Sequence, residues 1–329
     1  MIRTVLGDIP PAALGVTDAH DHLFFASAKL PGQELDDAAA AEAELRAFAA
    51  AGGQALAQWT PMGLGRRAEH LAALSEAAGV HLIAATGLHQ AGHYSPETLT
   101  PLLDGLAERF IAELTEGLRR DGDPDGPPVE DTAAGSGDRD GNGDRAAAEI
   151  RSPRAGLVKV AGDFHQVDRH ASMTFAAAAA AHQATGATIA VHLEGGTHPL
   201  GVLKALEGVP ASSVILGHLN RFPDLGPHRE AAEAGAFLGF DGPSRANHAT
   251  DWRLFDCLAA LIDSGHTDQI LLGGDTTSAA ARLSSGGGPG IPYLLTDIRA
   301  RVLRDFGPDV ADAFFLHNPA RAFDTDWQA

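Results

Sequence analysis

Cysteine is nearly absent from this chain. Its 329 residues include a single cysteine, Cys257, so no disulfide can form within the molecule. A protein without disulfides fits a reducing compartment, and we therefore expect it in the cytoplasm. Cys257 lies in WRLFDCLAALI, a predicted helix, where a buried packing role is expected rather than a reactive thiol.

Long hydrophobic runs and positive charge are also scarce. No apolar run reaches the roughly 18 residues that a membrane-spanning helix needs. The opening residues, MIRTVLGDIPP, lack the charged and apolar regions of a secretory signal. Lysine and arginine number 24 against 43 aspartate and glutamate residues, giving a formal net charge of −19. A field of that sign repels phosphates, so we expect neither a membrane nor a nucleic acid as partner.

Short apolar runs alternate with alanine-rich helical segments along the chain. Most runs are continuous, as in parallel strands that are covered on both faces. The predicted strands span residues 16–20, 54–60, 81–88, 156–162, 188–195, 213–220, 236–242 and 269–275. This alternation predicts an α/β fold of the (β/α)8 TIM-barrel class, with residues 1–329 as one domain. An open doubly wound sheet is the alternative, but no strand leads into a G-x-G-x-x-G turn.

One segment does not share this alternation. Residues 121–147 contain mostly Asp, Gly, Pro and Ala, so burial cannot offset the entropy lost on ordering, and we expect a flexible surface insert. A calcium-loop pattern, D-x-D-x-N-G-x5-E, is matched within residues 121–149 by Asp138, Asp140, Asn142, Gly143 and Glu149. Arg145 stands where this loop usually has an apolar residue, and no entering helix precedes it. A solvated linker is therefore favoured over calcium binding.

Metal-binding side chains gather where the predicted strands end, which is the end of such a barrel that carries the active site. They are His20, His22, Lys159, His192, His218 and Asp275. Each is weak evidence alone, because a lone strand histidine is more often a hydrogen-bonded core residue and a lone aspartate can simply cap a helix. Lys159 needs an explanation, since a buried ammonium is costly unless it is paired or neutralised.

Together these six side chains are a stronger signal. The alternation of side chains along a strand places both imidazoles of the His-x-His pair on one face. Nitrogen and oxygen donors of this kind suit zinc, with manganese, cobalt or iron as alternatives. Six ligands are too many for one tetrahedral zinc ion and about right for two metals that share a bridge.

The pattern resembles the phosphotriesterase-related family of the amidohydrolase superfamily. The resemblance covers nearly the whole chain except the insert. It includes the His-x-His pair, AATGLH at the third strand, LTEGL, GLVKVAG, the later histidines, the final aspartate and the closing FFLHNPARAF. Asp21 stands between the first two histidines where the family usually has glutamate, and the insert is longer than usual. Neither departure changes a predicted ligand.

The resemblance implies that the six side chains hold two divalent metal ions. The more buried ion would be bound by His20, His22 and Asp275, and the more exposed ion by His192 and His218. Lys159 would react with carbon dioxide and bridge both ions as a carbamate, which would remove the cost of burying its ammonium. The metals would activate a bridging hydroxide as nucleophile, and Asp275 would accept its proton as general base.

The resemblance also implies a small-molecule substrate. A lactone or related carboxylic ester is favoured, with a phosphotriester or an acyl amide as alternatives. A metal-containing barrel that binds a small ligand without turnover is the non-enzymatic alternative. Barrels of this family often form homodimers, although no residue pattern here requires one.

Residues that follow the ligand-bearing strands are candidates for substrate binding. They are His89, Arg221, Arg245, Arg282 and Tyr293. The arginines could bind a carboxylate or phosphate, although surface salt bridges explain such residues equally well. The glycine-rich SSGGGPGIPYLL is long enough for a substrate lid. Trp59 and Phe240 are expected in the core.

Overall fold

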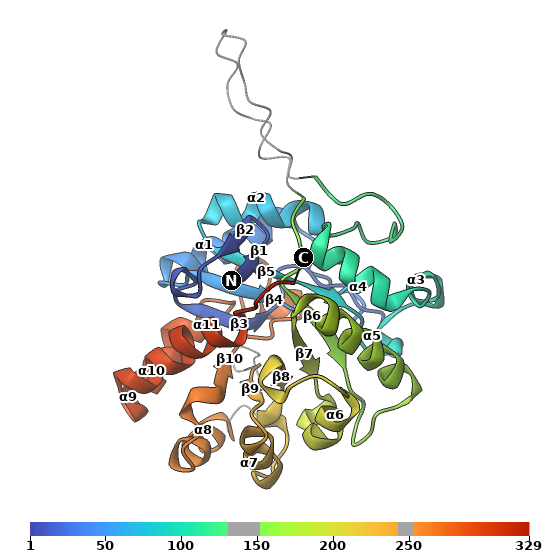
Figure 1. Ribbon diagram of the computed structural model, residues 1–329. Coiled ribbons are helices and arrows are strands. Elements are labelled where there is room, and N and C mark those ends of the chain that lie inside the picture. The colour runs from blue at the N-terminus through green and yellow to red at the C-terminus, as the bar shows by residue number, and fades with distance from the viewer. Residues whose placement is uncertain (131–151, 243–252, 329) are drawn as a thin grey trace.

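The computed structural model describes residues 1–130, 152–242 and 253–328 (Figure 1). Within these ranges, eight parallel strands form one sheet in which neighbours in space are neighbours in sequence. They are β3 (Thr17–Asp21), β4 (Ala55–Gln58), β5 (His81–Gly87), β6 (Leu157–Ala161), β7 (Thr188–His192), β8 (Val214–Gly217), β9 (Phe237–Phe240) and β10 (Ile270–Leu272). All eight predicted strands are confirmed, although several end earlier than predicted because the chain turns into the loops that carry the polar side chains.

The last strand returns to the first, so the sheet curves into a barrel rather than staying open. The backbone N–H of Asp275 donates to the carbonyl oxygen of His20 at 2.9 Å. The backbone N–H of Gly274 lies 3.3 Å from Oδ1 of Asp18. A Cβ atom on Gly273 would lie 2.6 Å from both the Cβ and the carbonyl oxygen of His20, so only glycine permits this approach. The predicted TIM-barrel class is confirmed.

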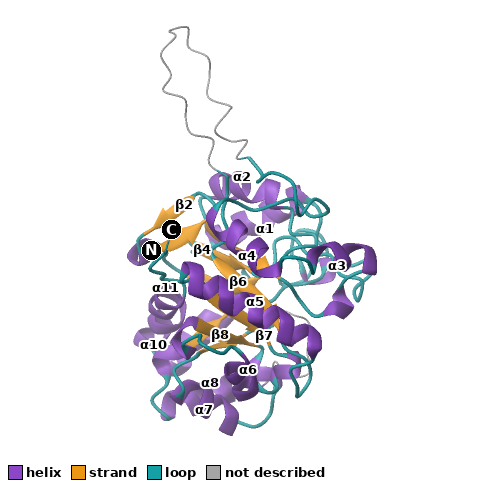
Figure 2. Cartoon of the chain, turned by 45° about the vertical axis from the view of Figure 1, so that its right-hand side comes forward, coloured by secondary structure: helices purple, strands orange, loops and turns teal. Residues whose placement is uncertain are grey.

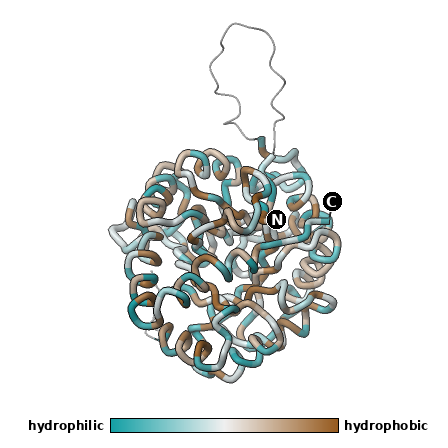
Figure 3. Tube along the Cα trace, turned by 60° about the vertical axis from the view of Figure 1, so that its left-hand side comes forward, coloured by the Kyte–Doolittle hydropathy of each residue, from teal (hydrophilic) through white to brown (hydrophobic). Residues whose placement is uncertain are grey.

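Helices surround the barrel, as Figure 2 shows. Those that follow strands are α1 (Ala38–Ala50), α2 (Ala68–Ala78), α3 (Pro96–Leu102), α4 (Leu106–Thr115), α5 (Arg169–Thr185), α6 (Pro199–Ala205), α7 (Gly226–Glu233) and α8 (Leu254–Asp263). The C-terminal region adds α9 (Ala300–Phe306), α10 (Pro308–Asp312) and α11 (Asn318–Ala322). In Figure 3 hydrophobic and hydrophilic stretches alternate along the outer helices, as expected when each packs one face on a sheet. Cys257 is buried on α8.

Trp59 fills the barrel interior beneath the strand ends. Its side chain is 1% exposed, and it is surrounded by small interior residues that include Ala57, Ala85 and Ala190. These alanines leave the space that the indole ring occupies. The ring stacks on His20 with centroids 3.7 Å apart, so it also supports that imidazole from below. Phe240 is fully buried, and the predicted core positions of both aromatic residues are confirmed.

A short antiparallel hairpin precedes the barrel and was not predicted from the sequence. It pairs β1 (Ile2–Thr4) with β2 (Gly7–Ile9). Ile2 is fully buried and joins Leu14 and Phe323 in the interior cluster of the barrel. The two ends of the chain meet here, since the amino group of Met1 lies 2.6 Å from Asp324.

The first part of the expected insert packs on the barrel. Asp121 accepts hydrogen bonds from the backbone N–H groups of Gly63 and Arg66, at 2.9 and 2.6 Å. Val129 is 2% exposed and donates its N–H to the carbonyl of Leu118. Residues 131–151, which include the calcium-loop pattern, lie outside the described residues. Across the described ranges, the helices are too short or too polar to cross a membrane.

The closing contact at Gly273 generates a prediction. Gly273→Ala places a methyl group against the backbone of His20, so the free energy of unfolding should fall by about 1–3 kcal/mol. Gly226→Ala is the matched control, because a Cβ there meets only the side chain of Asp224, whose Oδ1 lies 3.2 Å away. The control should stay within about 0.5 kcal/mol of wild type. Urea unfolding of the three proteins measures both effects, and equal stability of Gly273→Ala and wild type would contradict the closure argument.

Candidate metal centre

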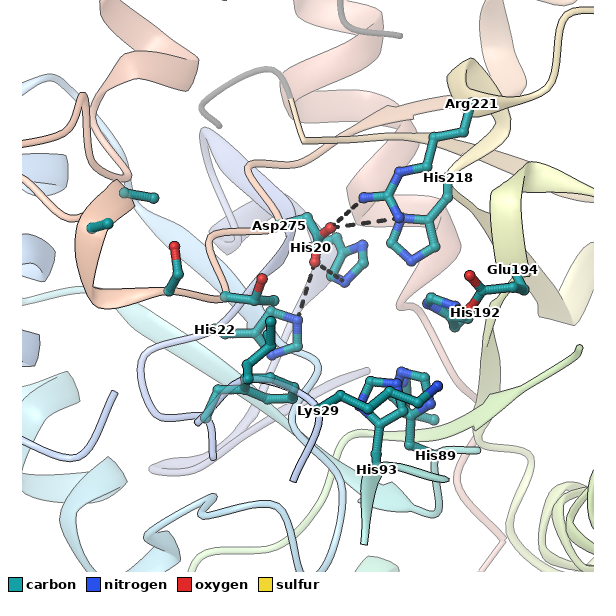
Figure 4. A pocket seen from close by; sticks show the side chains of 17 residues that line it. His20, His22, Lys29, His89, His93, His192, Glu194, His218, Arg221 and Asp275 are labelled. Atoms are coloured by element: carbon teal, nitrogen blue, oxygen red, sulfur yellow. Dashed lines mark hydrogen bonds and ion pairs between the residues drawn. The ribbon is translucent and has the colours of Figure 1, made fainter. Parts of the chain in front are cut away.

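A cavity of about 460 Å³ lies at the carboxyl ends of the barrel strands (Figure 4). The structure brings all six predicted metal ligands to its wall. Their positions follow from the strands: His20 and His22 at the end of β3, Lys159 in β6, His192 at the end of β7, His218 after β8 and Asp275 after β10. Residues that are up to 255 positions apart are therefore neighbours, because parallel barrel strands end on one side.

Three of these side chains converge closely. Nε2 of His20 and Nε2 of His22 lie 3.5 and 3.3 Å from Oδ1 of Asp275. One ligand atom from each of the three residues lies within 4.8 Å of the other two, and all three residues are buried. Burial lowers the pKa of His22 to about 4, so its imidazole is neutral near pH 7. A neutral imidazole has the free lone pair that a metal requires.

The remaining three side chains line the neighbouring part of the cavity. The rings of His192 and His218 meet edge to face with centroids 4.4 Å apart. Burial lowers the pKa of His192 to about 4, although Glu194, whose Oε2 lies 3.0 Å from its Nε2, acts against this shift. Lys159 is 2% exposed and has no hydrogen-bond or ion-pair partner within the described ranges. Burial lowers the pKa of its amine to about 7, which the charge of Asp275 partly opposes.

This donor set fits divalent metal ions. His22 and His192 offer neutral nitrogens, Asp275 offers a carboxylate, and these are ligands that zinc and related metals bind. The Lys159 amine is buried with no hydrogen-bond or ion-pair partner among the described residues, and the burial of such a group is costly. A second acidic partner beside the metals would remove that cost, and conversion of the amine to an anion would do the same.

Asp241, which follows β9, sets the orientation of two histidines and was missed in the sequence. Its Oδ2 lies 2.8 Å from Nδ1 of His20, and its Oδ1 lies 2.5 Å from Nδ1 of His218. Both distances are those of hydrogen bonds. They are too short for a metal ion to lie between the nitrogen and the oxygen. Each ring therefore donates through Nδ1 and keeps Nε2 free for the cavity.

The same carboxylate is held in its ionised form. Burial raises the pKa of Asp241, but the charges and hydrogen bonds of His218 and His20 outweigh burial and lower that pKa far below its usual range. Its position could have been suspected from the sequence, because it is the second-last residue of the predicted strand 236–242, much as Asp275 ends the predicted strand 269–275.

Thr60 orients His22 in the same way. Its hydroxyl donates to the carbonyl oxygen of Phe24 at 2.5 Å and lies 2.8 Å from Nδ1 of His22. Because the hydroxyl proton is used by Phe24, the hydroxyl oxygen accepts from Nδ1, and Nε2 of His22 is left with its lone pair.

Two residues of the site adopt left-handed backbone conformations. The φ angles are 67° at His218 and 49° at Asp275. Such a conformation costs a residue other than glycine about 1–3 kcal/mol and persists only where surrounding contacts enforce it. Here the N–H of His218 donates to Asp241 at 3.1 Å, and that of Asp275 donates to His20. These contacts turn both side chains towards the cavity.

Arg221 lies at the cavity, as predicted, but it contacts the carboxylates of the site. One terminal nitrogen lies 2.6 Å from Oδ2 of Asp275 and 3.7 Å from Oδ1 of Asp241. Asp275 thus directs one oxygen to Arg221 and the other to His20 and His22 (Figure 4). The arginine orients this carboxylate in addition to any contact with a substrate.

Two of the predicted substrate-binding residues lie elsewhere. Arg282 is buried, donates to the carbonyl oxygen of His22 and lies 3.9 Å from Glu44, while Tyr293 packs half-buried against the outer core. Neither is among the described residues that line the cavity. The loop after β10 lines the cavity within residues 277–281, but Glu44 of α1 accepts the N–H groups of Ser284 and Ile291 and so ties this later part of the loop to α1. Arg245 lies outside the described residues.

Other cavity residues complete the wall. His89 lies there as predicted, whereas Lys29, His93 and Glu194 were not identified from the sequence. Lys29 and His93 follow no strand end directly, so their approach depends on how the loops after β3 and β5 pack together. Glu194 follows His192 by two residues, a spacing that could have indicated it.

Comparisons with known proteins agree with this geometry. The model of the phosphotriesterase family matches residues 1–122 and 146–323. A phospho-furanose lactonase of Mycoplasmopsis agalactiae is 29% identical over 271 residues, which are 78% of this chain and 70% of that protein. The crystal structure of a lactonase from Listeria monocytogenes superposes with a TM-score of 0.83 at 27% identity and covers 99% of both chains. An amidohydrolase structure from Mycoplasma synoviae gives a TM-score of 0.80 at 26% identity, over 99% of this chain and 92% of that one.

The contacts of Asp241 generate a prediction. In Asp241→Asn only one side-chain atom can accept, so one imidazole loses the partner of its Nδ1 and its fixed orientation. Zinc affinity should fall about 10–100-fold, measured as metal retained after dialysis against graded chelator concentrations. Asp263→Asn, at the exposed end of α8, is the control and should retain zinc as wild type does. Unchanged zinc affinity in Asp241→Asn, with circular dichroism showing a folded protein, would refute this role.

Proposed function

Because the chain belongs to the phosphotriesterase family and is a hydrolase, we propose that it opens a lactone or cleaves a related carboxylic ester. The observation that carries this proposal is the convergence of four histidines, one lysine and one aspartate on a single buried cavity wall. The names of the similar lactonases support an ester bond in a ring as the target. A cavity of about 460 Å³ has room for a small ring and its substituents.

The proposed site holds two divalent metal ions, with zinc favoured over manganese, cobalt or iron. His20, His22 and Asp275 would bind one, His192 and His218 the other, and a Lys159 carbamate would bridge them. When bound, the metals would lower the pKa of a shared water and polarise the carbonyl oxygen of the substrate. Every ligand in this assignment is buried or nearly so, which shields these side chains from most of the bulk water.

The environment of Lys159 supports the carbamate. Nitrogen attacks the carbon of carbon dioxide, and one proton leaves, so a neutral amine is converted to an anion. A pKa of about 7 leaves much of the amine unprotonated at neutral pH, which this reaction requires. A buried anion between cations is also far less costly than the unpaired ammonium it replaces.

Asp275 is the proposed general base. Its Oδ1 lies between His20 and His22, while Oδ2 is bound by Arg221 at 2.6 Å. The arginine therefore fixes the carboxylate, and the other oxygen is directed to the centre of the cavity, where a nucleophilic water would lose its proton. After ring opening the same carboxylic acid can return that proton to the leaving alkoxide, so the proton balance closes.

A substrate panel tests the proposed reaction. Enzyme purified with zinc and bicarbonate is assayed on lactones, aryl carboxylic esters, N-acyl amino acids and an aryl dialkyl phosphotriester. We expect kcat/KM for a lactone to exceed that for the phosphotriester and the amides by orders of magnitude. Turnover of the phosphotriester or an amide far above every lactone would overturn the proposal, as would binding without turnover across the whole panel. Intact mass reports the carbon dioxide adduct on Lys159 in the same preparation.

The proposed base generates a second prediction. Asp275→Asn should lower kcat/KM for the best lactone by about 10²–10⁴-fold, because the amide cannot accept the proton. Asp275 is also a proposed ligand, so rates are compared per active site after zinc is quantified. Asp263→Asn serves as control and should retain the wild-type rate. Near-complete turnover by zinc-loaded Asp275→Asn would exclude this aspartate as the base.

A further inference from the structure

One wall of the cavity carries two stacked imidazoles that the proposed metal binding does not use. The rings of His89 and His93 lie 4.1 Å apart between centroids and 22° from parallel. Both line the cavity, and the ring of His89 lies 4.6 Å from that of His192 (Figure 4). His93 is the outer ring of the pair, and Lys29 lines the same wall beside it.

The tautomer of His89 is set by the backbone. The N–H of Gln90 donates to Nδ1 of His89 at 2.6 Å, so this nitrogen carries a lone pair and no proton. In a neutral imidazole the proton then belongs to Nε2. An imidazole that accepts a hydrogen bond at Nδ1 carries its single proton on Nε2, and such a ring is neutral.

Ser27 sets the tautomer of His93 by a similar argument. Its hydroxyl oxygen accepts the backbone N–H of Lys29 at 3.1 Å and lies 2.9 Å from Nδ1 of His93. Among the residues that the structure describes, Nδ1 is the one acceptor found for the hydroxyl proton. His93 therefore accepts at Nδ1 and carries its proton on Nε2, while burial lowers its pKa to about 3.

In both rings Nδ1 is hydrogen-bonded within the protein, and the N–H group of Nε2 is left to donate to another molecule. Across the described ranges, neither Nε2 has a hydrogen-bond partner, although both rings face the cavity. When a ligand displaces the water that is bound to an N–H donor, the ligand must accept a hydrogen bond from that donor, because an unpaired donor weakens binding. Because the two ring centroids are 4.1 Å apart and both rings line the cavity, their N–H groups are close enough to bind two neighbouring oxygen atoms of one molecule.

We propose that His89 and His93 form a pair of uncharged N–H donors that bind two adjacent oxygens of the substrate. His89, beside His192, donates to an oxygen of the reacting ester, and His93 donates to an oxygen on the carbon next to the carbonyl. This inference rests on the proposed function and narrows it to lactones that carry a hydroxyl group next to the carbonyl. A lactone without that oxygen leaves the N–H of His93 unpaired once water is displaced.

Two five-membered lactones, with and without a hydroxyl on the carbon next to the carbonyl, test the inference. Wild-type enzyme should prefer the hydroxylated lactone in kcat/KM by about tenfold or more, the worth of one hydrogen bond. His93→Phe removes the donor and should bring this ratio to about one. His93→Gln keeps an N–H donor at a similar reach and should restore part of the preference.

The variants of His89 separate its contact from that of His93. His89→Phe should lower kcat/KM on both lactones by about 10–100-fold at unchanged zinc content, and His89→Gln should lose much less. His81→Phe, at the opposite end of the same strand β5, is the control and should leave the ratio and the rates as in wild type. Circular dichroism and zinc content of every variant identify any loss that comes from unfolding.

The outcomes distinguish the two proposals. If zinc-loaded wild type hydrolyses both lactones equally, or if His93→Phe lowers both rates by the same factor, the donor pair is refuted while lactone hydrolysis stands. If zinc-loaded wild type hydrolyses neither lactone nor any other on the panel, the proposed function itself fails. Equal behaviour of the Phe and Gln variants of His89 would likewise exclude a donor role for this ring.

Discussion

The carboxylate of Asp241 is the contact on which the arrangement of the site depends. It joins the side chains of His20 and His218, which come from β3 and β8, and it receives the backbone N–H of His218. Through this one group, three strands of the barrel share a hydrogen-bond network. Both imidazoles are thereby oriented with Nε2 towards the cavity. A buried carboxylate that is fully hydrogen-bonded is rigid, and an unpartnered one would be very costly, so the network either forms as a whole or not at all.

Burial also determines which charges the side chains of the site can carry. The interior beneath it is apolar, with Trp59 stacked on His20 and small alanines around the indole. Such surroundings disfavour charged forms, and burial therefore lowers the pKa of His22, His192 and Lys159. The site therefore presents neutral imidazole nitrogens, which have the free lone pair that a divalent cation requires. The packing of the barrel interior and the chemistry of the site thus have one physical origin.

The two sides of the cavity then differ in chemistry. On one side, Asp275 and Arg221 form a fixed ion pair beside the histidines, suited to moving a proton. On the other side, the backbone of Gln90 and the hydroxyl of Ser27 assign the protons of His89 and His93, suited to holding oxygen atoms in place. His22 and His192, two of the other proposed metal ligands, lie between these two sides (Figure 4). This asymmetry would orient a substrate in the cavity. Its oxygen atoms would accept hydrogen bonds from His89 and His93, and the proposed nucleophile would form beside the proposed base, Asp275.

The sequence by itself determined the barrel and its six converging side chains, because strand periodicity and the rule that parallel strands end on one side need only local patterns. It also indicated the core positions of Trp59 and Phe240. Only the tertiary structure decided which further groups reach the cavity. Thr60 and His93 act through contacts with residues distant in the chain, which no local pattern contains, and the strand-end position of Asp241 did not reveal which histidines it contacts. Arg282 and Tyr293 lie away from the cavity for the same reason: Glu44, some 240 residues earlier, holds Ser284 and Ile291 of their loop beside α1, and a loop side chain points wherever such long-range contacts fix its backbone.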